Sequence, residues 1–375
     1  MARGLFVEPF YGGSHRAFLD GLVRHSAHEL ELLTLPEGEW RRRIRRGAQE
    51  LALRAKELPD ELDFLVVSDM LDLPAFLALT RPRFERVPIL AYFHENQMTY
   101  PRLRGTKFNS WFGQINYLTA LAADAAAFNS EFHRSDFLGA LRSLLAEPNN
   151  WLLADGVDEV ERKSSVLPVG VELDWIDALE CERETTGPRT ILWNHRWEFD
   201  KSPELFVRAL DALAAQGIEF KLIIAGEPGD NPSEAIMSLP ERFPERIRHF
   251  GFAPSKEDYG RLLWQSDIVI STTRHEFFGV GMVEAMAAGC IPCAPKRYNY
   301  PALVPPELHG ALLWENETEL VEKLALLLTG ELPGREALRE SARQFAWANV
   351  IRPWDRVLSA LVRGDFATKP SIPDA

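Results

Sequence analysis

The stretch His275-Glu-Phe-Phe-Gly-Val-Gly-Met-Val-Glu-Ala-Met-Ala-Ala-Gly289 carries the strongest indication of the fold. It follows an apolar run, turns through a glycine and then continues as a helix that we expect to begin at about Gly281. A strand, a glycine-containing turn and a helix in this order are typical of a nucleotide-binding βαβ unit, and the backbone N–H groups at the helix start favour a diphosphate. Glu276 lies on the turn, and Glu284 lies in the first turns of the helix, where a carboxylate can accept hydrogen bonds from a ribose diol.

The same alternation of short apolar runs and amphipathic stretches continues along the chain on both sides, which predicts two mostly parallel sheets. We predict an α/β protein with two Rossmann-like, doubly wound domains that face a central cleft. The expected domains are residues 1–178, residues 179–340, and a helical tail at 341–375 that returns to the first domain. The strands expected in the first domain are Gly4–Glu8, Phe64–Ser68, Ile89–Phe93, Ala125–Asn129 and Ser165–Pro168. Those expected in the second are Thr190–Trp193, Lys221–Ala225, Arg248–Phe250, Ile268–Ser271 and Ile291–Ala294.

The composition excludes several classes of protein. A chain of 375 residues with 46% hydrophobic and 26% charged residues is an ordinary globular protein with room for two domains. No apolar run reaches the ~18 residues of a membrane span, and the start of the chain lacks the core of a signal peptide. With only three cysteines, a cytoplasmic protein without stable membrane association is expected. The net charge of −13 argues against histone-like binding to nucleic acid but leaves room for a local basic patch.

A second cluster of polar residues follows the strand at Thr190–Trp193. Arg196 and Lys201 are two cations that can stabilise negative charge on a phosphate-bearing ligand, a task that a metal performs elsewhere. No Asp-x-Asp pair ends a strand in this half, so we expect no metal; the alternative for Lys201 is a plain surface ion pair with Asp200. Asn194 and Gly226 also end strands here and are expected to line the base or phosphate pocket of this half. The motif Cys290-Ile-Pro-Cys293 lacks a second cysteine pair and is interpreted as two buried thiols.

The first half carries two motifs at strand ends. Glu8-Pro-Phe-Tyr-Gly-Gly-Ser-His15 follows the first strand, and its adjacent glycines either let a ligand approach the backbone or form a tight turn only. Ala91-Tyr-Phe-His-Glu-Asn-Gln-Met-Thr-Tyr-Pro101 leaves the third strand with a run of polar residues that is costly to bury without a purpose.

These motifs resemble known families. The two glutamates in the Glu276 to Gly289 stretch, with Arg196 and Lys201, are similar to the donor motif of the retaining GT-B glycosyltransferases of family 4. The two motifs of the first half are more specific and resemble the tRNA-queuosine mannosyltransferases, which transfer mannose from GDP-mannose to queuosine in the anticodon of an aspartate tRNA. The resemblance covers nearly the whole chain, and it implies a retaining, metal-independent hexosyltransferase whose donor is a nucleotide sugar and whose partner is queuosine-containing tRNA. No cofactor is expected, and no carboxylate is evidently placed as a nucleophile.

The resemblance also assigns roles to residues. The catalytic residues it implies are His94, which approaches the transferred sugar, and Glu276, Arg196 and Lys201. The donor-binding residues would be Gly12, Gly13, Asn194, Gly226, Phe278, Gly279 and Glu284. The acceptor-binding residues would be Ser14, His15, Glu95, Asn96 and Gln97, of which the last three either read the acceptor or shape their loop.

A basic cluster at Arg41–Arg46 suits RNA phosphates in an otherwise acidic chain. We add Arg42, Arg43, Arg46, Arg102 and Arg104 to the expected acceptor surface. The alternative is a solvated helix whose arginines pair with Glu37, Glu39 and Glu50. Two other functions stay open: a glycan or lipid-linked mannosyltransferase, and a catalytically inactive RNA-binding protein on the same fold.

Overall fold

The chain folds into two compact units, shown in a computed structural model that describes residues 1–58, 61–101, 110–184, 186–229 and 232–365. The described part of the first unit consists of residues 1–58, 61–100, 110–170 and 347–365. That of the second consists of Pro101 and residues 171–184, 186–229 and 232–346. The chain thus passes from the first unit to the second between Gly170 and Val171 and returns at Trp347.

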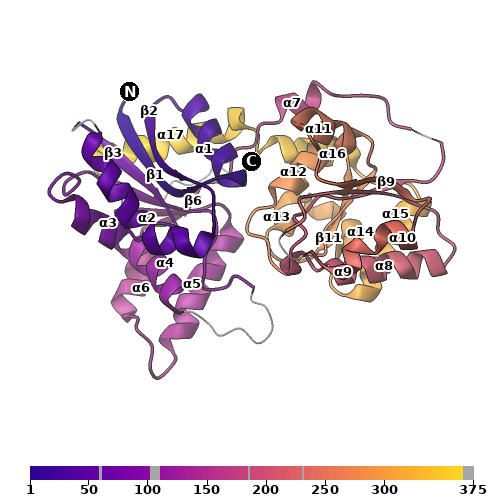
Figure 1. Cartoon of the computed structure of the whole chain (residues 1–375), viewed down its shortest axis with the longest axis horizontal. Helices are drawn as coiled ribbons and strands as arrows, with labels where there is room; N and C mark the ends of the chain where they lie inside the picture. The colour runs from indigo at the N-terminus through magenta and orange to yellow at the C-terminus, as the bar shows by residue number, and fades with distance from the viewer. Residues whose placement is uncertain (59–60, 102–109, 185, 230–231, 366–375) are drawn as a thin grey trace. The chain divides into compact units, whose positions relative to one another are not determined.

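The first unit is built on a parallel sheet in the order β2-β1-β3-β4-β5-β6 (Figure 1). Its central strands are continuous apolar runs because helices cover both faces of the sheet, and every side chain of β3 and β4 is buried. The strands are β1 (Arg3–Tyr11), β2 (Glu29–Pro36), β3 (Phe64–Ser68), β4 (Ile89–Phe93), β5 (Ala125–Phe128) and β6 (Ser164–Val166). The helices are α1 (Gly13–His25), α2 (Trp40–Arg54), η1 (Ala55–Glu57), α3 (Leu73–Thr80), α4 (Ser110–Ala122), α5 (Glu131–Leu145), α6 (Ala154–Arg162) and α17 (Trp347–Arg363).

The last helix, α17, packs in the first unit although it ends the chain (Figure 1, yellow). Its Trp354 is fully buried, with its ring 4.7 Å from Tyr92 and 5.4 Å from Phe18 of α1. The indole N–H of Trp354 donates to the carbonyl of Pro168 at 3.1 Å, and Ser26 donates to the Asp355 carboxylate at 2.7 Å. The helix therefore packs against α1 and hydrogen-bonds to Pro168, which follows β6.

The second unit repeats the design with a parallel sheet in the order β12-β11-β10-β7-β8-β9. Its strands are β7 (Thr190–Trp193), β8 (Lys221–Ala225), β9 (Ile247–Gly251), β10 (Ile268–Ile270), β11 (Ile291–Pro295) and β12 (Leu313–Trp314). Its helices are α7 (Asp174–Asp177), η2 (Phe199–Lys201), α8 (Pro203–Ala215), α9 (Glu234–Met237), α10 (Leu239–Arg242), α11 (Lys256–Trp264), α12 (Val280–Ala287), α13 (Tyr300–Leu303), η3 (Pro306–Leu308), α14 (His309–Leu312), α15 (Glu317–Thr329) and α16 (Arg335–Arg343).

All ten predicted strands are present with shifts of at most three residues at their ends, and two strands of the described residues were not predicted. The strand β2 lies at an edge of its sheet and mixes Glu with Leu, so it lacks a continuous apolar run. The other, β12, is an edge strand of two residues, too short to leave a pattern. Among the described residues, the helices all fall short of the length and apolarity that crossing a bilayer requires.

Candidate active site

The second unit places the fold-defining stretch at the carboxyl end of β10, where the chain turns into α12. Gly279 caps this helix with a φ of +102°, a conformation that a side chain would strain, which explains the glycine between strand and helix. The first turn of α12 carries no acidic residue, so its free N–H groups face no carboxylate of their own turn. This is the local geometry that favours an anion.

Lys201 ends η2 and Glu276 lies on the segment between β10 and α12, and their side chains lie together in the second unit. The Lys201 Nζ is 3.6 Å from Glu276 and 3.1 Å from Asp200. The Asp200 side chain is only 2% exposed and that of Lys201 13%, so this is not the surface ion pair considered above. Burial lowers the pKa of Lys201, but the Glu276 and Asp200 carboxylates outweigh it and leave that pKa raised above its ordinary value. The ammonium is thus kept charged in a largely enclosed place.

The loop that carries Lys201 is held by the segment after β10. Arg274 donates its backbone N–H to the carbonyl of Asp200 at 2.7 Å, and Thr272 donates its hydroxyl to the carbonyl of Lys201 at 2.9 Å. Because Glu276 follows on this same segment, the cation and the carboxylate are fixed relative to each other by backbone contacts.

Glu284 takes part in a hydrogen-bond chain that sequence reasoning missed. The amide of Asn194 donates to the Tyr259 hydroxyl at 2.9 Å and to the carbonyl of Gly281 at 2.9 Å, and the Tyr259 hydroxyl donates to Glu284 at 3.1 Å. Burial raises the pKa of Glu284 to about 7, although the Tyr259 hydrogen bond and the charge of Lys256 lower it. Asn194 and Tyr259 thereby fix the position of a carboxyl that titrates near neutral pH.

A cavity of about 420 Å³ opens beside this chain, within the size range of small-molecule sites. Three of the predicted donor residues line it, namely Asn194, Arg196 and Gly226. A Cβ at position 226 would come within 1.9 Å of the carbonyl of His195, so only glycine fits there. Phe252 and Tyr259 add aromatic surface, and the Phe252 side chain is 65% exposed.

Two residues predicted on the donor side, Arg196 and Phe278, are not enclosed polar groups as Lys201 and Glu284 are. Arg196 is 63% exposed in its side chain and lies 3.2 Å from Glu198. Phe278 is buried, and its ring packs edge-on against Phe345 at 5.2 Å, so its side chain belongs to the interior of the unit. Cys290 and Cys293 are free, buried thiols, and burial raises the pKa of Cys293 to about 12, which agrees with their interpretation as small apolar residues.

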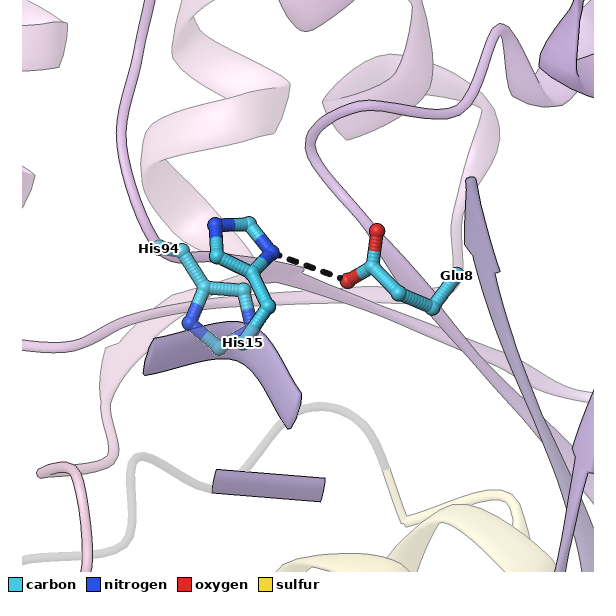
Figure 2. A group of neighbouring side chains, drawn as sticks. All are labelled: Glu8, His15 and His94. Atoms are coloured by element: carbon cyan, nitrogen blue, oxygen red, sulfur yellow. Dashed lines mark hydrogen bonds and ion pairs between the residues drawn. The ribbon is translucent and has the colours of Figure 1, made fainter. Parts of the chain in front are cut away.

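In the first unit, Glu8, His15 and His94 lie together (Figure 2). Glu8 is fully buried near the end of β1, and its carboxylate accepts from Ser68 at 3.0 Å, from the backbone of Phe10 at 2.8 Å and from the His15 ring at 3.1 Å. The His15 ring lies against that of His94, with centroids 4.2 Å apart. Strands β1 and β4, which lie on either side of β3, and helix α1 thus bring the two predicted histidines together around an unpredicted carboxylate.

The two histidines differ in charge. Burial lowers the pKa of His15, but the Glu8 carboxylate, with Asp69 and Glu95, outweighs it and raises that pKa to about 9, so the ring is an imidazolium at neutral pH. Burial lowers the pKa of His94 well below its usual value, and the charge of His15 lowers it further. The Nε2 of His94 is buried without a hydrogen-bond partner among the described residues, which leaves a neutral ring with one nitrogen ready for a ligand.

Asp69, directly after β3, holds the backbone of His94 by a hydrogen bond. Its carboxyl accepts the backbone N–H of His94 at 2.8 Å, and its other oxygen is buried without a partner in the described part of the chain. Burial raises the pKa of Asp69 well above its ordinary value, and Glu95 raises it further. Asp69 could have been found from the sequence, because it directly follows the strand Phe64–Ser68 as His94 directly follows the strand Ile89–Phe93.

One ligand atom each of Glu8, His15 and His94 lies within 4.8 Å of the others, a spacing that a divalent metal ion could use. However, both oxygens of Glu8 already accept hydrogen bonds from the protein, and a protonated His15 cannot coordinate a metal. A metal ion would have to displace the proton that Glu8 holds on His15. The arrangement therefore favours a proton over a metal.

The other predicted acceptor residues fall into two kinds. Asn96 is fully buried, and its side-chain oxygen accepts from the backbone of Met98 and Thr99 at 3.0 Å each, so it shapes the loop. Gln97 donates to Glu95 at 2.8 Å. Ser14 is exposed in the first turn of α1. Of the two glycines predicted to bind the donor, Gly13 is exposed beside it and Gly12 is buried before the helix.

The arginines of α2 also divide into two groups. Arg43 lies 3.7 Å from Glu50 with its side chain only 16% exposed, as the ion-paired alternative expects. Arg42 and Arg46 are exposed on one face, and their side chains make no ion pair or hydrogen bond with the described residues. Arg102 and Arg104 lie outside the described residues.

Comparison with known proteins identifies the family. The N-terminal model of tRNA-queuosine alpha-mannosyltransferases matches residues 3–171, and that of the glycosyl transferases group 1 matches residues 180–345. A tRNA-queuosine alpha-mannosyltransferase of Drosophila melanogaster is 34% identical over 331 residues, 85% of each chain. The chain belongs to the tRNA-queuosine alpha-mannosyltransferase family. It is a glycosyltransferase, and the resemblance noted from its motifs is confirmed.

More distant relatives and solved structures share the fold. A GDP-mannose:cellobiosyl-diphosphopolyprenol alpha-mannosyltransferase of Xanthomonas oryzae pv. oryzae is 25% identical over 90% of this chain and 83% of its own. Sucrose-phosphate synthase of Thermosynechococcus elongatus superposes with a TM-score of 0.69 at 13% identity, over 96% of this chain and 99% of its own. Trehalose 6-phosphate synthase of Burkholderia multivorans superposes with a TM-score of 0.66 at 16% identity, over 97% of this chain and 99% of its own. The α/β class and the GT-B fold are thereby confirmed.

Proposed function

We propose that this family member transfers a mannosyl group from GDP-mannose to a queuosine hydroxyl in the anticodon of a tRNA, with retention at the anomeric carbon and without a metal. The observation that carries the proposal is the match of residues 3–171 to the N-terminal model of tRNA-queuosine alpha-mannosyltransferases, because this is the unit with the more specific motifs. In this proposal, the two domains predicted from the sequence bind different substrates: residues 1–178 bind the acceptor and residues 179–340 bind the donor.

The donor assignment rests on the second unit. The cavity of about 420 Å³ suits a nucleoside, and Glu284 is held where a ribose diol would be read. The free N–H groups at the start of α12 suit the diphosphate. Mannose and guanine are supported by the names of two relatives, one a mannosyltransferase and the other a user of GDP-mannose.

In the proposed reaction, the bond between the anomeric carbon and the diphosphate oxygen breaks, and a bond to the acceptor oxygen forms. Negative charge develops on the diphosphate, and the hydroxyl proton is released with GDP. Lys201, kept charged by Glu276 and Asp200, and Arg196 would stabilise that charge in place of a metal. Glu276 would bind the transferred sugar, and His94 would offer its unpartnered Nε2 to a hydroxyl group.

The acceptor assignment rests on charge and chemistry in the first unit. Exposed Arg42 and Arg46 give α2 a basic face that suits phosphates in a chain of net charge −13. The direct test incubates purified protein with queuosine-containing tRNA and either GDP-mannose or UDP-galactose, followed by mass spectrometry of the nucleosides. We expect a hexosyl-queuosine from GDP-mannose only. No product from any nucleotide hexose would refute queuosine as the acceptor and leave the glycosyltransferase assignment intact.

A second candidate is a lipid-linked acceptor, which the Xanthomonas relative favours by its name. Under that alternative, the same protein would transfer mannose to a polyprenyl diphosphate saccharide and ignore tRNA. Running both acceptors with one donor preparation separates the two functions.

A further inference from the structure

We infer that Trp111, with Trp40 and the arginines packed on both, forms a stacking surface for an unpaired RNA base next to the acceptor nucleoside. The inference rests on the proposed tRNA acceptor and adds a binding site for a second nucleotide. We call Trp40, Arg41, Arg45, Trp111 and Phe112 the aromatic–basic surface.

The first observation is an exposed tryptophan. Trp111, in the first turn of α4, is 39% exposed, and of the tryptophans that the structure describes it is the only one in the exposed class. Exposing so large an apolar ring to water is unfavourable, and aromatic rings at surfaces often mark binding sites.

The second observation is the set of cations on these rings. The Arg45 guanidinium lies 5.9 Å from the Trp111 ring centroid and 5.5 Å from that of Phe112. That of Arg41 lies 4.5 Å from the Trp40 ring. Planar guanidinium groups and aromatic rings are the two kinds of surface on which unpaired RNA bases stack, and the charge also attracts phosphates.

The third observation is that the surface is held in place from beneath. The Phe112 ring is 5.3 Å from Trp40 and 5.4 Å from Trp111, and Phe112 is itself 5% exposed. It belongs to a small apolar cluster with Ile44, Met70 and Ile115. The rings are therefore positioned before any ligand arrives, which reduces the entropy cost of binding.

The fourth observation links this surface to the histidines. Phe10 packs against the same apolar cluster, and its ring lies 5.7 Å from that of His15, which in turn lies against His94. Helices α2 and α4 begin where β2 and the β4 loop end, at the same edge of the sheet as Glu8 and His94. A nucleoside at His94 would therefore lie at the same edge of the sheet as Trp40 and Trp111.

Single-stranded RNA fits these features better than a duplex or a protein partner. A-form duplexes are bound through phosphates and 2′-hydroxyls and offer no free base face, whereas an anticodon loop does. The exposed arginines Arg42 and Arg46, on the same helix as Trp40 and Arg45, add positive charge, which favours a phosphate-bearing chain.

The test uses an unmodified anticodon stem-loop RNA, so that binding is measured without sugar transfer. Fluorescence anisotropy should show that Trp111→Ala weakens binding about 5- to 150-fold, the range for loss of one stacked base. Trp111→Phe should retain most of the affinity. The salt slope should stay unchanged in Trp111→Ala and fall by about 1.4 in Arg42→Gln/Arg46→Gln, because only arginines contact phosphates.

Leu118→Ala is the matched control, since Leu118 is an exposed apolar residue two turns further along α4 and outside the surface. It should bind the stem-loop as the wild type does, and circular dichroism should show that all variants are folded. Unchanged binding by Trp111→Ala, or an equal loss with a stem duplex that lacks the loop, would overturn the inference. If Trp111→Ala weakens loop binding while queuosine accepts no sugar, the inference holds and the proposed acceptor fails.

Discussion

Donor affinity should rise with pH, because the carboxyl proposed to read the ribose, Glu284, titrates near neutrality. Burial raises its pKa to about 7, and a diol donates hydrogen bonds to the ionised form. The protonated form must therefore lose its proton before it can accept both hydroxyls. With that pKa, about one in eleven molecules is ionised at pH 6, about half at pH 7 and about ten in eleven at pH 8. The dissociation constant for GDP-mannose should fall about tenfold from pH 6 to pH 8, or ~1.4 kcal/mol.

Isothermal titration calorimetry gives both the affinity and the proton count. Titrations at pH 6, 7 and 8 in two buffers of different ionisation enthalpy should show release of about 0.9 proton at pH 6 and about 0.1 at pH 8. Two neighbouring histidines and Lys201 do not change charge in this window. The pKa of His195 is lowered to about 3 and that of His275 to about 4, in both cases by burial first, and Lys201 stays charged.

Two variants separate Glu284 from other causes. Glu284→Gln removes the titration, so its weaker affinity should be flat from pH 6 to pH 8. Tyr259→Phe removes a hydrogen bond that lowers the pKa of Glu284, so its affinity curve should move to higher pH. A pH-independent wild type, or the same slope in Glu284→Gln, would refute the reasoning.

The contribution of Glu284 to folding stability changes with pH in the opposite direction to donor affinity. A carboxyl whose pKa is raised in the folded state stabilises the fold below its unfolded value of 4.5, and this stability is lost as pH rises to about 7. Donor binding should therefore stabilise the protein more at pH 8 than at pH 6. Thermal unfolding with and without GDP-mannose measures this directly.

Three further expectations concern the chemistry and the acceptor. Lys201→Ala and Glu276→Ala should each lower kcat at least ~100-fold, the scale of one lost electrostatic contact in the transition state, and near-normal turnover would remove that residue from the site. Activity should survive EDTA; a loss that Mg²⁺ or Mn²⁺ restores would exclude the metal-free mechanism. Arg42→Glu/Arg46→Glu should weaken tRNA binding with GDP-mannose affinity unchanged, measured by anisotropy and calorimetry, and normal tRNA binding would move the RNA surface elsewhere. Arg43 is omitted from that variant because its contact with Glu50 would be lost as well.

Much of the fold was predictable because the central strands are buried on both faces. Runs such as Phe64–Val67 and Ile89–Phe93 contain apolar residues throughout, so they stand out without an alignment. The edge strand Glu29–Pro36 is half exposed and mixes charge with leucine, which hides it. The last helix was expected to return to the first domain; its position follows from contacts such as Trp354 with Tyr92, which no local pattern encodes.

The candidate site was predictable only where polar residues end a strand. His94, Glu276 and Asn194 were found in this way, and Asp69 was available to the same rule. Tyr259 was not, because it lies within α11 among ordinary helical residues and reaches Glu284 only through the fold. The role of Glu8 was hidden too, since a buried glutamate near a strand end becomes informative only when His15 is seen beside it.

Both sheets explain why strand ends were so informative. In the first unit the chain leaves β1 toward β2 and then resumes at β3 on the other side, so Glu8 and Asp69 lie at the point where the strand order reverses. In the second, the corresponding point lies between β7 and β10, and there Asn194 and Glu276 follow the two strands. Adjacent loops diverge at such a point and leave a crevice at the carboxyl edge, which is where open α/β sheets bind ligands. Three buried polar groups with shifted pKa values, His94, Asp69 and Glu284, lie along these two edges, and such groups are characteristic of binding and catalytic sites.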